Sequence, residues 1–548
     1  MSTDAGEHPL RQRTAFGLGD RYLYPGNSLR VAITLMLAGM ALSFLVIGYR
    51  SPYWNRAASD IVSAYEGLLY NQGLPQEFLA YPAVLSGQLL GLWYRLLHTV
   101  GLLSVDRLSD LPARPSIAQA DVIWQSLVGW ARVYSLLLGA LYAVAFTCMI
   151  QRLTGVWQIA ALAGFALAFS SGIALEYRII RSELLSSALI VTAILATILA
   201  PRERDENRQL AWLAVAGFCT ALGFIEKVQA LMPAMAIPLI GLPFAPAAPG
   251  RDAATTPEQN AQDWRKAAVI AALAIGFLIP ALRLMLWGMR ALATDAYMPY
   301  PVLGGHLSGV YQWLIGLWIA GAMIAYGWLW RVRPAHTAAG LAAVAFGIAV
   351  GLCVLFLRHQ PEVLVAVANP LEHLQAHAGA PDAGLAAGSL LGVIGKALGS
   401  IGTALAIHTF VFYPSHRPTL IVEWLAIAAA VVLWQRGDRQ RCLQIAVLLA
   451  TAFALDGLFT LRQYKVFYLP FTDPLIVIAG AIAAVPFLGL LLEARVQRIT
   501  MVVLALYIAW GNAQPVRIVY GESEKLGKIC GVVAQFTKRI SWPHCKAS

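Results

Sequence analysis

The sequence predicts an all-α polytopic membrane protein with about thirteen transmembrane helices. Of its 548 residues, 59% are hydrophobic and only 13% are charged, and the mean hydropathy is +0.64. These values are far more apolar than those of soluble domains. The apolar residues also form separate runs of about 20 residues, which is the length that a helix needs to cross the hydrocarbon core of a bilayer.

Thirteen such runs follow one another along the chain. They are centred near residues 40, 138, 165, 192, 217, 238, 277, 320, 348, 427, 450, 477 and 506. The N-terminal segment is polar and lacks the cleavage pattern of a secretory signal peptide, so we expect the first span to be retained. A further apolar segment, 390–413, is rich in glycine and contains Lys396, so we interpret it as an interfacial or re-entrant helix.

The basic residues predict the orientation of the spans, because short cytoplasmic loops are enriched in Lys and Arg. With the N-terminus inside, the predicted inner segments hold 18 of the 40 Lys and Arg residues, at roughly twice the density of the outer segments. These inner segments are 1–30, 151–155, 201–209, 244–266, 331–338, 435–441 and 488–498. An odd number of spans then places the C-terminus outside.

This orientation divides the chain into three parts. We predict a cytoplasmic tail over 1–30, a transmembrane domain over 31–513 and a periplasmic tail over 514–548. Two long outer loops, 49–124 and 358–418, interrupt the transmembrane domain. The basic, alanine-rich composition and the short inner loops are typical of a bacterial inner membrane protein, which gives the expected location.

Composition also limits the classes of function. The net charge of +11 is spread over many membrane loops, where it sets topology, so we expect no nucleic acid partner. The six cysteines and ten histidines show no compact ligand spacing, so we assign no metal. Cys530 and Cys545 both lie in the predicted outer tail, where an oxidising compartment would permit a disulfide bond.

The first outer loop carries an isolated aspartate, Asp60, near its start. An acidic residue at the edge of a bilayer is costly to place and commonly has a function. This position, followed by an amphipathic run and the Tyr81-Pro82 turn, indicates sugar transfer from a lipid carrier. The alternative is structural, because Ser59 and Asp60 also suit the N-cap of a helix in a solvated loop.

Cations gather at the predicted outer ends of later spans. Arg178 and Arg181 are three residues apart, so on a helix they would share one face, and Glu176 and Glu183 could pair with them. Three further cations lie at a comparable depth: Lys227, Arg462 and Lys465. The phosphate of a lipid carrier lies at this depth, where Arg or Lys would neutralise it. For each cation taken alone, an ion pair that orients a helix end is the alternative.

Several segments, in chain order, resemble those of a known superfamily. The early Asp60 is followed by ARVYSLLLGALY at 131–142, by YRIIRSELL at 177–185 and by ALGFIEKVQALMP at 221–233. A late stretch, RQYKVFYLPFTDPL at 462–475, extends the match. In this order and spacing the chain resembles the GT-C superfamily of integral membrane glycosyltransferases, which includes protein O-mannosyltransferases and the lipid A aminoarabinose transferase.

The resemblance implies a GT-C-like bundle with interfacial helices in its long first outer loop. It also implies a reaction on the outer face, in which a polyprenyl-phosphate sugar donor glycosylates a glycan or glycolipid acceptor. Asp60 would act as the general base. The donor phosphate would be held by Arg178, Arg181, Lys227, Arg462 and Lys465. Further candidates for positioning the substrates are Tyr81, Glu183 and His408.

The chain departs from the family pattern at three points. Many relatives carry an acidic pair in the first loop, but here Ile61 follows Asp60, and Glu66 is six residues away. A frequent His-Pro is Tyr81-Pro82 in this chain. The hairpin lysine is preceded by Glu226, which could pair with it. These differences leave the acceptor and any requirement for a divalent metal open.

Two other functions remain as alternatives. A transporter or flippase of a lipid-linked sugar would place charges at the bilayer midplane and would show repeated halves, neither of which the sequence contains. An enzyme resembling the O-antigen ligases or polymerases would place its main catalytic loop late in the chain, at Arg358–Arg417.

Overall fold

The computed structural model describes residues 27–77, 83–244, 258, 261–276, 310–330, 332–354, 390–409, 417–460, 468–521, 530, 537, 539–540 and 542–545. Over this part of the chain all regular structure is helical, and no strand occurs. Among these described residues, eight helices are long and apolar enough to cross a membrane, as judged by length and composition. The chain is therefore a polytopic, all-helical membrane protein, as predicted.

Eight of the predicted span centres fall within these eight helices. The helices are α1 (Asn27–Ser43, continued by η1, Phe44–Gly48), α4 (Ile117–Thr154), α7 (Ser182–Leu199), α8 (Glu206–Glu226), α12 (Pro334–Cys353), α17 (Arg439–Thr460), α18 (Leu469–Ala484) and α20 (Ala494–Gly521). Four further centres fall in helices whose apolar stretches are shorter: α5 (Trp157–Ala168), α9 (Leu231–Gly241), α11 (Val310–Leu329) and α16 (Thr419–Gln435). The centre near 277 lies outside the described residues, so the total of thirteen stays a prediction.

The core of the bundle is built around α18. Its sequence, LPFTDPLIVIAGAIAA, is apolar on every face, and almost every residue of the helix is buried. A helix without a polar stripe has no face to turn to solvent, so other helices surround it. The main hydrophobic core joins α18 to α1, α4, α5, α7 and α17 through side chains such as Phe146, Ile194 and Ile478.

α4 is much longer than a membrane span. Ser116 and Gln119 form a capping box at its start, and Gly155, with a φ of 71°, ends it. A helix of 38 residues is about 57 Å long, whereas the hydrocarbon core of a bilayer is about 30 Å thick. α4 must therefore extend well beyond the bilayer, at least at one end.

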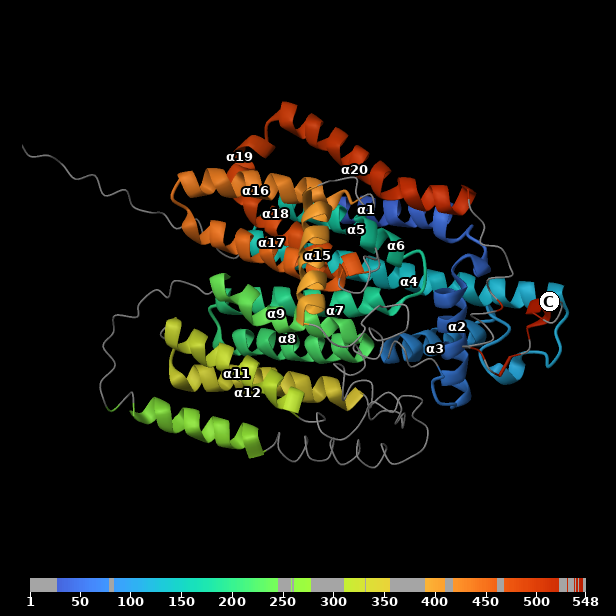
Figure 1. Cartoon of the computed structure of the whole chain (residues 1–548), viewed down its shortest axis with the longest axis horizontal. Coiled ribbons are helices and arrows are strands. Elements are labelled where there is room, and N and C mark those ends of the chain that lie inside the picture. The colour runs from blue at the N-terminus through green and yellow to red at the C-terminus, as the bar shows by residue number, and fades with distance from the viewer. Residues whose placement is uncertain are drawn as a thin grey trace, which may run out of the picture.

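The first turns of α4 carry a separate helical layer. α2 (Ala57–Gln72) and α3 (Val84–Thr99) pack against them at one end of the bundle (Figure 1). A second hydrophobic core, which includes Tyr65, Tyr94 and Leu127, holds this layer together. We call the described residues of 49–124 the first-loop domain, and the end of the bundle that it covers the first-loop end. The predicted first loop thus contains helices folded against α4.

α15 (Leu390–Thr409) runs across the direction of most of the bundle helices rather than along it (Figure 1). Ser400 fastens it to the end of α17, because its hydroxyl donates to the carbonyl of Gly457 and lies 2.9 Å from the hydroxyl of Thr460. The interfacial or re-entrant placement of this segment stays a prediction. Residues 410–413 of that predicted segment lie outside the described residues.

Glycines allow α8 and α12 to pack closely. A Cβ added at Gly217 would collide with the backbone carbonyl of Val344, and one added at Gly347 would collide with that of Ala214. Within a bilayer, small residues at an interface let two backbones approach and gain van der Waals contact. These two positions therefore determine how α12 joins the bundle.

We predict that Gly347→Leu destabilises the protein by about 1–3 kcal/mol or more, because the added side chain meets backbone that cannot move aside. The measurement is thermal unfolding of the purified protein in nanodiscs. Gly316→Leu is the matched control, since this exposed α11 position has open space around it and should change stability by less than about 0.5 kcal/mol. Equal melting temperatures for the two variants would contradict the packing assignment.

Candidate functional site

The buried carboxylates of the bundle helices lie close to helix ends. Among the described residues they are Glu176 in α6 (Ser171–Glu176), Glu183 in α7, Glu226 in α8, Glu423 in α16, Asp456 in α17 and Asp473 in α18. These helix ends meet. Ser186 donates to the carbonyl of Gly223, and Gly172 in α6 packs on Leu469 and Pro470 at the start of α18. The charged side chains therefore gather at the first-loop end.

Asp60 is fully buried and both of its carboxylate oxygens accept hydrogen bonds. Arg132 of α4 donates to Oδ2 from Nε at 2.9 Å and from Nη2 at 2.6 Å. The backbone N–H of Ile180 donates to Oδ1 at 2.9 Å. Asp60 lies in the first turn of α2, so the alternative of an N-cap is wrong. Its side chain instead ties α2 to α4 and to the segment before α7.

Arg132 was not among the predicted site residues, because it lies inside an apolar span. Its guanidinium is completely buried and also donates to the backbone carbonyls of Gly48 and Pro52, each at 3.0 Å. Buried charges are tolerated when every donor finds an acceptor. The signal in the sequence was the rarity of an arginine in a transmembrane helix, which usually implies a buried acidic partner.

Arg178 lies in the turn between α6 (Ser171–Glu176) and α7, and its buried guanidinium has no counter-ion among the described residues. Nη2 donates to the hydroxyl of Ser43 at 2.5 Å and to the side-chain oxygen of Asn512. In the part of the chain that the structure describes, Nε and Nη1 have no hydrogen-bond partner. The ring of Tyr177 lies 5.3 Å from the guanidinium carbon. Burial lowers the pKa of Arg178, which records the cost of this uncompensated charge.

The neighbouring cations, in contrast, have acidic partners. Arg181 Nη2 lies 2.7 Å from Glu183 Oε1, and its Nε lies 3.7 Å from a carboxylate oxygen of Glu176. Lys227 Nζ lies 2.9 Å from Glu183. These four side chains form a cluster of two positive and two potentially negative groups. Neither oxygen of Glu176 accepts a hydrogen bond from a described residue, and burial raises the pKa of this carboxyl to about 8.

Two sequence expectations about these residues are wrong. Arg178 and Arg181 do not share a helix face, because α6 ends at Glu176 and α7 begins at Ser182, so the two arginines reach different partners from a turn. Glu226 turns away to α3, where it accepts hydrogen bonds from the backbone N–H groups of Leu85 and Ser86 and from the Ser86 hydroxyl. A carboxylate at a helix N-terminus is favoured by the orphan N–H groups there.

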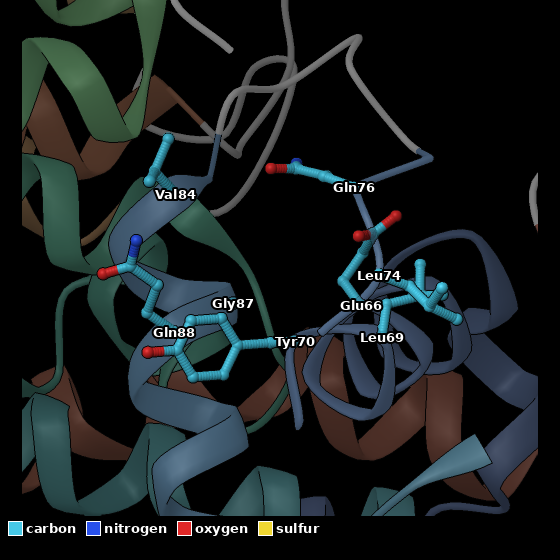
Figure 2. A pocket seen from close by; sticks show the side chains of 8 residues that line it. All are labelled: Glu66, Leu69, Tyr70, Leu74, Gln76, Val84, Gly87 and Gln88. Atoms are coloured by element: carbon cyan, nitrogen blue, oxygen red, sulfur yellow. The ribbon is translucent and has the colours of Figure 1, made fainter. Parts of the chain in front are cut away.

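A shallow hollow opens between α2 and α3 (Figure 2). It contains roughly 250 Å³ of space, part of it open to solvent, and its polar lining comes from Glu66, Tyr70, Gln76 and Gln88. The backbone N–H of Glu77 donates to Glu66 at 3.2 Å, which holds the connection after α2 at the rim. Polar side chains from both helices thus line the hollow.

The C-terminal tail packs onto the first-loop domain. Cys530 and Cys545 form the predicted disulfide bond. Trp542 stacks on Trp124 of α4, with ring centroids 4.8 Å apart, and Arg539 lies 2.6 Å from Glu77. Glu77 also accepts a hydrogen bond of 2.7 Å from Tyr65 of α2. The tail therefore holds the rim of the hollow in place.

The structure brings together five of the predicted site residues. They are Asp60, Arg178, Arg181, Glu183 and Lys227. His408 is buried in a different group of side chains, between α15, α16 and α17. Three other predicted residues lie outside the described residues: Tyr81, Arg462 and Lys465. Where the chain is described, no three His, Cys, Asp or Glu side chains are arranged to hold a metal ion.

We predict that Asp60→Asn alone destabilises the protein by about 3–5 kcal/mol, because it leaves the Arg132 guanidinium buried without its counter-ion. The double variant Asp60→Asn with Arg132→Met should recover a large part of this loss. A double-mutant cycle on unfolding free energies in mixed micelles measures the coupling. Simple additivity of the two single changes would show that the pair does not act as a unit.

We predict that replacing Cys530 and Cys545 with serine loosens the rim of the hollow. A disulfide that closes a loop of 15 residues stabilises a fold by about 3 kcal/mol in the chain-entropy account. Hydrogen exchange measured by mass spectrometry should therefore rise in the peptides around Tyr65 and Glu77. Cys148→Ser, at an exposed free cysteine, is the control. Unchanged exchange at Glu77 would mean that the tail does not support the first-loop domain.

Comparison with known proteins identifies no relative of this chain. No protein-family model, no curated protein and no solved structure matches it. Evidence about the function therefore comes from the buried charged side chains at the first-loop end.

Proposed function

We propose that the protein is a GT-C type glycosyltransferase, which moves a sugar from a polyprenyl-phosphate carrier to a glycan or glycolipid acceptor at the outer face of a bacterial inner membrane. The observation that carries the proposal is the buried guanidinium of Arg178, two of whose nitrogens find no hydrogen-bond partner among the described residues. It lies at the end of the bundle where Asp60 also lies, and Asp60 accepts a hydrogen bond from Ile180, two residues further along the same turn.

An unpaired buried cation favours an anionic ligand. Burying a charge without a counter-ion costs several kcal/mol, and a bound phosphate would offset much of this cost. Arginine is suited to phosphate because its planar guanidinium offers several fixed N–H donors. Arg181 and Lys227 are further proposed contacts, but Glu176 and Glu183 already balance their charges. Arg178 is therefore the main phosphate-binding residue of the proposal.

The surroundings of Arg178 suit a lipid-linked phosphate. Its partners Ser43 and Asn512 lie on α1 and α20. Both helices expose apolar side chains, such as Leu35 on α1 and Leu506 on α20, as helices that face lipid do. A polyprenyl chain could lie against these helices while its phosphate reaches the buried guanidinium.

The proposed reaction needs one base and one cation. The acceptor hydroxyl attacks the anomeric carbon of the sugar, its proton passes to a carboxylate, and the bond from that carbon to the phosphate oxygen breaks. Arg178 stabilises the charge that the departing lipid phosphate gains. We assign the base to Asp60. Oδ2 keeps its ion pair with Arg132, and Oδ1, which accepts from Ile180 in this structure, takes the proton.

The distribution of charge favours a transferase over a flippase. A flippase must carry a phosphate through the middle of the bilayer, where charged side chains mark the path of a transported substrate. In the described helices of the bundle, the buried carboxylates lie near their ends at the first-loop end. This arrangement suits chemistry at one membrane surface.

The test uses purified protein in nanodiscs, a radiolabelled polyprenyl-phosphate sugar and an extract of envelope glycans and lipids. We expect Arg178→Gln to reduce transfer by about 100-fold or more. Binding of the unglycosylated polyprenyl phosphate should weaken about 10- to 100-fold, because a charge-assisted hydrogen bond is lost. Arg152→Gln is the matched control, since this arginine pairs with Glu203 at the opposite end of α4.

The outcomes separate the parts of the proposal. If the wild type transfers label and Arg178→Gln binds and transfers as well as Arg152→Gln, the phosphate assignment is wrong. If Asp60→Asn is folded and transfers at the wild-type rate, Asp60 is not the base. If labelled lipid crosses the bilayer of a proteoliposome and no acceptor is labelled, the protein is a flippase.

A further inference from the structure

A second buried charged group joins α15, α16, α17 and α18, and the proposed reaction does not use it. At its centre is His408 of α15. Its Nδ1 lies 2.8 and 2.9 Å from the two carboxylate oxygens of Glu423, and its Nε2 lies 3.0 Å from an oxygen of Asp456. All three side chains are buried. The imidazole therefore bridges two carboxylates on two different helices.

The hydrogen-bond chemistry of this bridge requires a proton. An ionised carboxylate only accepts hydrogen bonds, and a neutral imidazole has one N–H donor and one acceptor nitrogen. Both contacts of His408 are hydrogen bonds only if the ring is an imidazolium or if one carboxyl group is protonated. A neutral ring between two carboxylates would place a ring lone pair against an oxygen lone pair in a buried site, which is unfavourable.

The charged groups around the His408 bridge carry a net negative charge, which favours protonation of the site. Arg417, just ahead of α16, donates to Asp456 at 2.5 Å and to Asp473 of α18 at 2.8 Å. Three buried carboxylates thus face one guanidinium, which leaves an excess of two negative charges when the imidazole is neutral. The other side chains that contact this group among the described residues carry no charge. Phe453 packs beside the imidazole, and Thr419 and Thr472 donate to or accept from the Arg417–Asp473 pair.

We propose that His408, Glu423 and Asp456 form a buried site that binds one proton, and that this proton fastens α15 to α16 and α17. The inference is independent of the proposed function, because it rests on the geometry of this second group alone. When the proton is bound, the imidazolium attracts both carboxylates. When it leaves, the ring can donate a hydrogen bond to only one of the two carboxylates, and its other nitrogen sets a lone pair against the second carboxylate, so α15 is held less firmly.

The direction in which stability changes with pH follows from the binding of the proton in the folded state. The folded protein holds the proton more strongly than an exposed histidine would, so the stabilisation is fully present at low pH and is lost as the pH rises through the range in which the site releases it. Loss of the proton at high pH should therefore loosen α15.

Glu423→Gln is the variant that best separates the bound proton from the shape of the site. A glutamine side chain can donate an N–H to one ring nitrogen while the other ring nitrogen donates to Asp456, so a neutral imidazole then satisfies both contacts. The variant removes the need for the bound proton and keeps the shape of the site. It should therefore fold, and its stability should not depend on the proton.

The first measurement is nitrogen NMR of histidine-labelled protein in nanodiscs, with His408→Asn used to assign the signal. At about pH 7 we expect both ring nitrogens of His408 to carry protons in the wild type and only one in Glu423→Gln. His98, whose ring faces the backbone carbonyl of Leu103, is the reference for a histidine without a carboxylate partner. Infrared difference spectra between the wild type and Glu423→Gln or Asp456→Asn detect the proton if a carboxyl group holds it instead.

The second measurement is thermal unfolding between about pH 6 and pH 10. The wild type should lose about 2 °C or more of melting temperature relative to Glu423→Gln as the pH rises. A neutral His408 together with no protonated carboxyl group in the wild type at about pH 7 would overturn the proton site. Parallel melting profiles for the two proteins would overturn the link between the proton and α15.

Discussion

The ion pair between Asp60 and Arg132 is the contact on which the arrangement of the site depends. The two residues are 72 positions apart in the chain, and both are completely buried. One carboxylate oxygen fixes α2 against α4, and the other fixes the backbone at Ile180. Taking such a pair out of water is costly, and the attraction between the charges roughly repays that cost. The pair therefore specifies geometry more than it adds stability, and the geometry that it specifies is the turn carrying Arg178.

Charge compensation is uneven across the first-loop end of the bundle. Arg181 and Lys227 share Glu183, and His408 lies between two carboxylates. Arg178 has polar neighbours but no counter-ion among the described residues. Folding alone would favour removing such a charge, since an apolar side chain of similar shape would fit the site at lower cost. Its presence is explained most simply by a ligand that brings the missing negative charge.

The class of fold could be predicted from the sequence because a membrane span is identified by the summed hydropathy of about 20 consecutive residues, without any knowledge of tertiary contacts. Most span centres fall on helices, and the disulfide in the tail was expected from two cysteines on one side of the membrane. The ion pairs could not be predicted, because they join residues that are distant in sequence. In the sequence, Arg132 is a single charged residue within an apolar segment. Asp456 and Glu423 are likewise single charged residues within apolar segments. Local spacing also misled, since Arg178 and Arg181 would share a face only on a helix and lie instead in a turn.

The contact between the C-terminal tail and the first-loop domain constrains the topology of the whole chain. Trp542 stacks on Trp124, so these two parts of the protein lie on the same side of the membrane. A chain that leaves one side and returns to it crosses an even number of times between the two points. Adding the first span makes the total odd, whichever way the protein is inserted. This parity agrees with thirteen crossings, and it allows α15 to be counted as a span only if one of the other predicted spans does not cross.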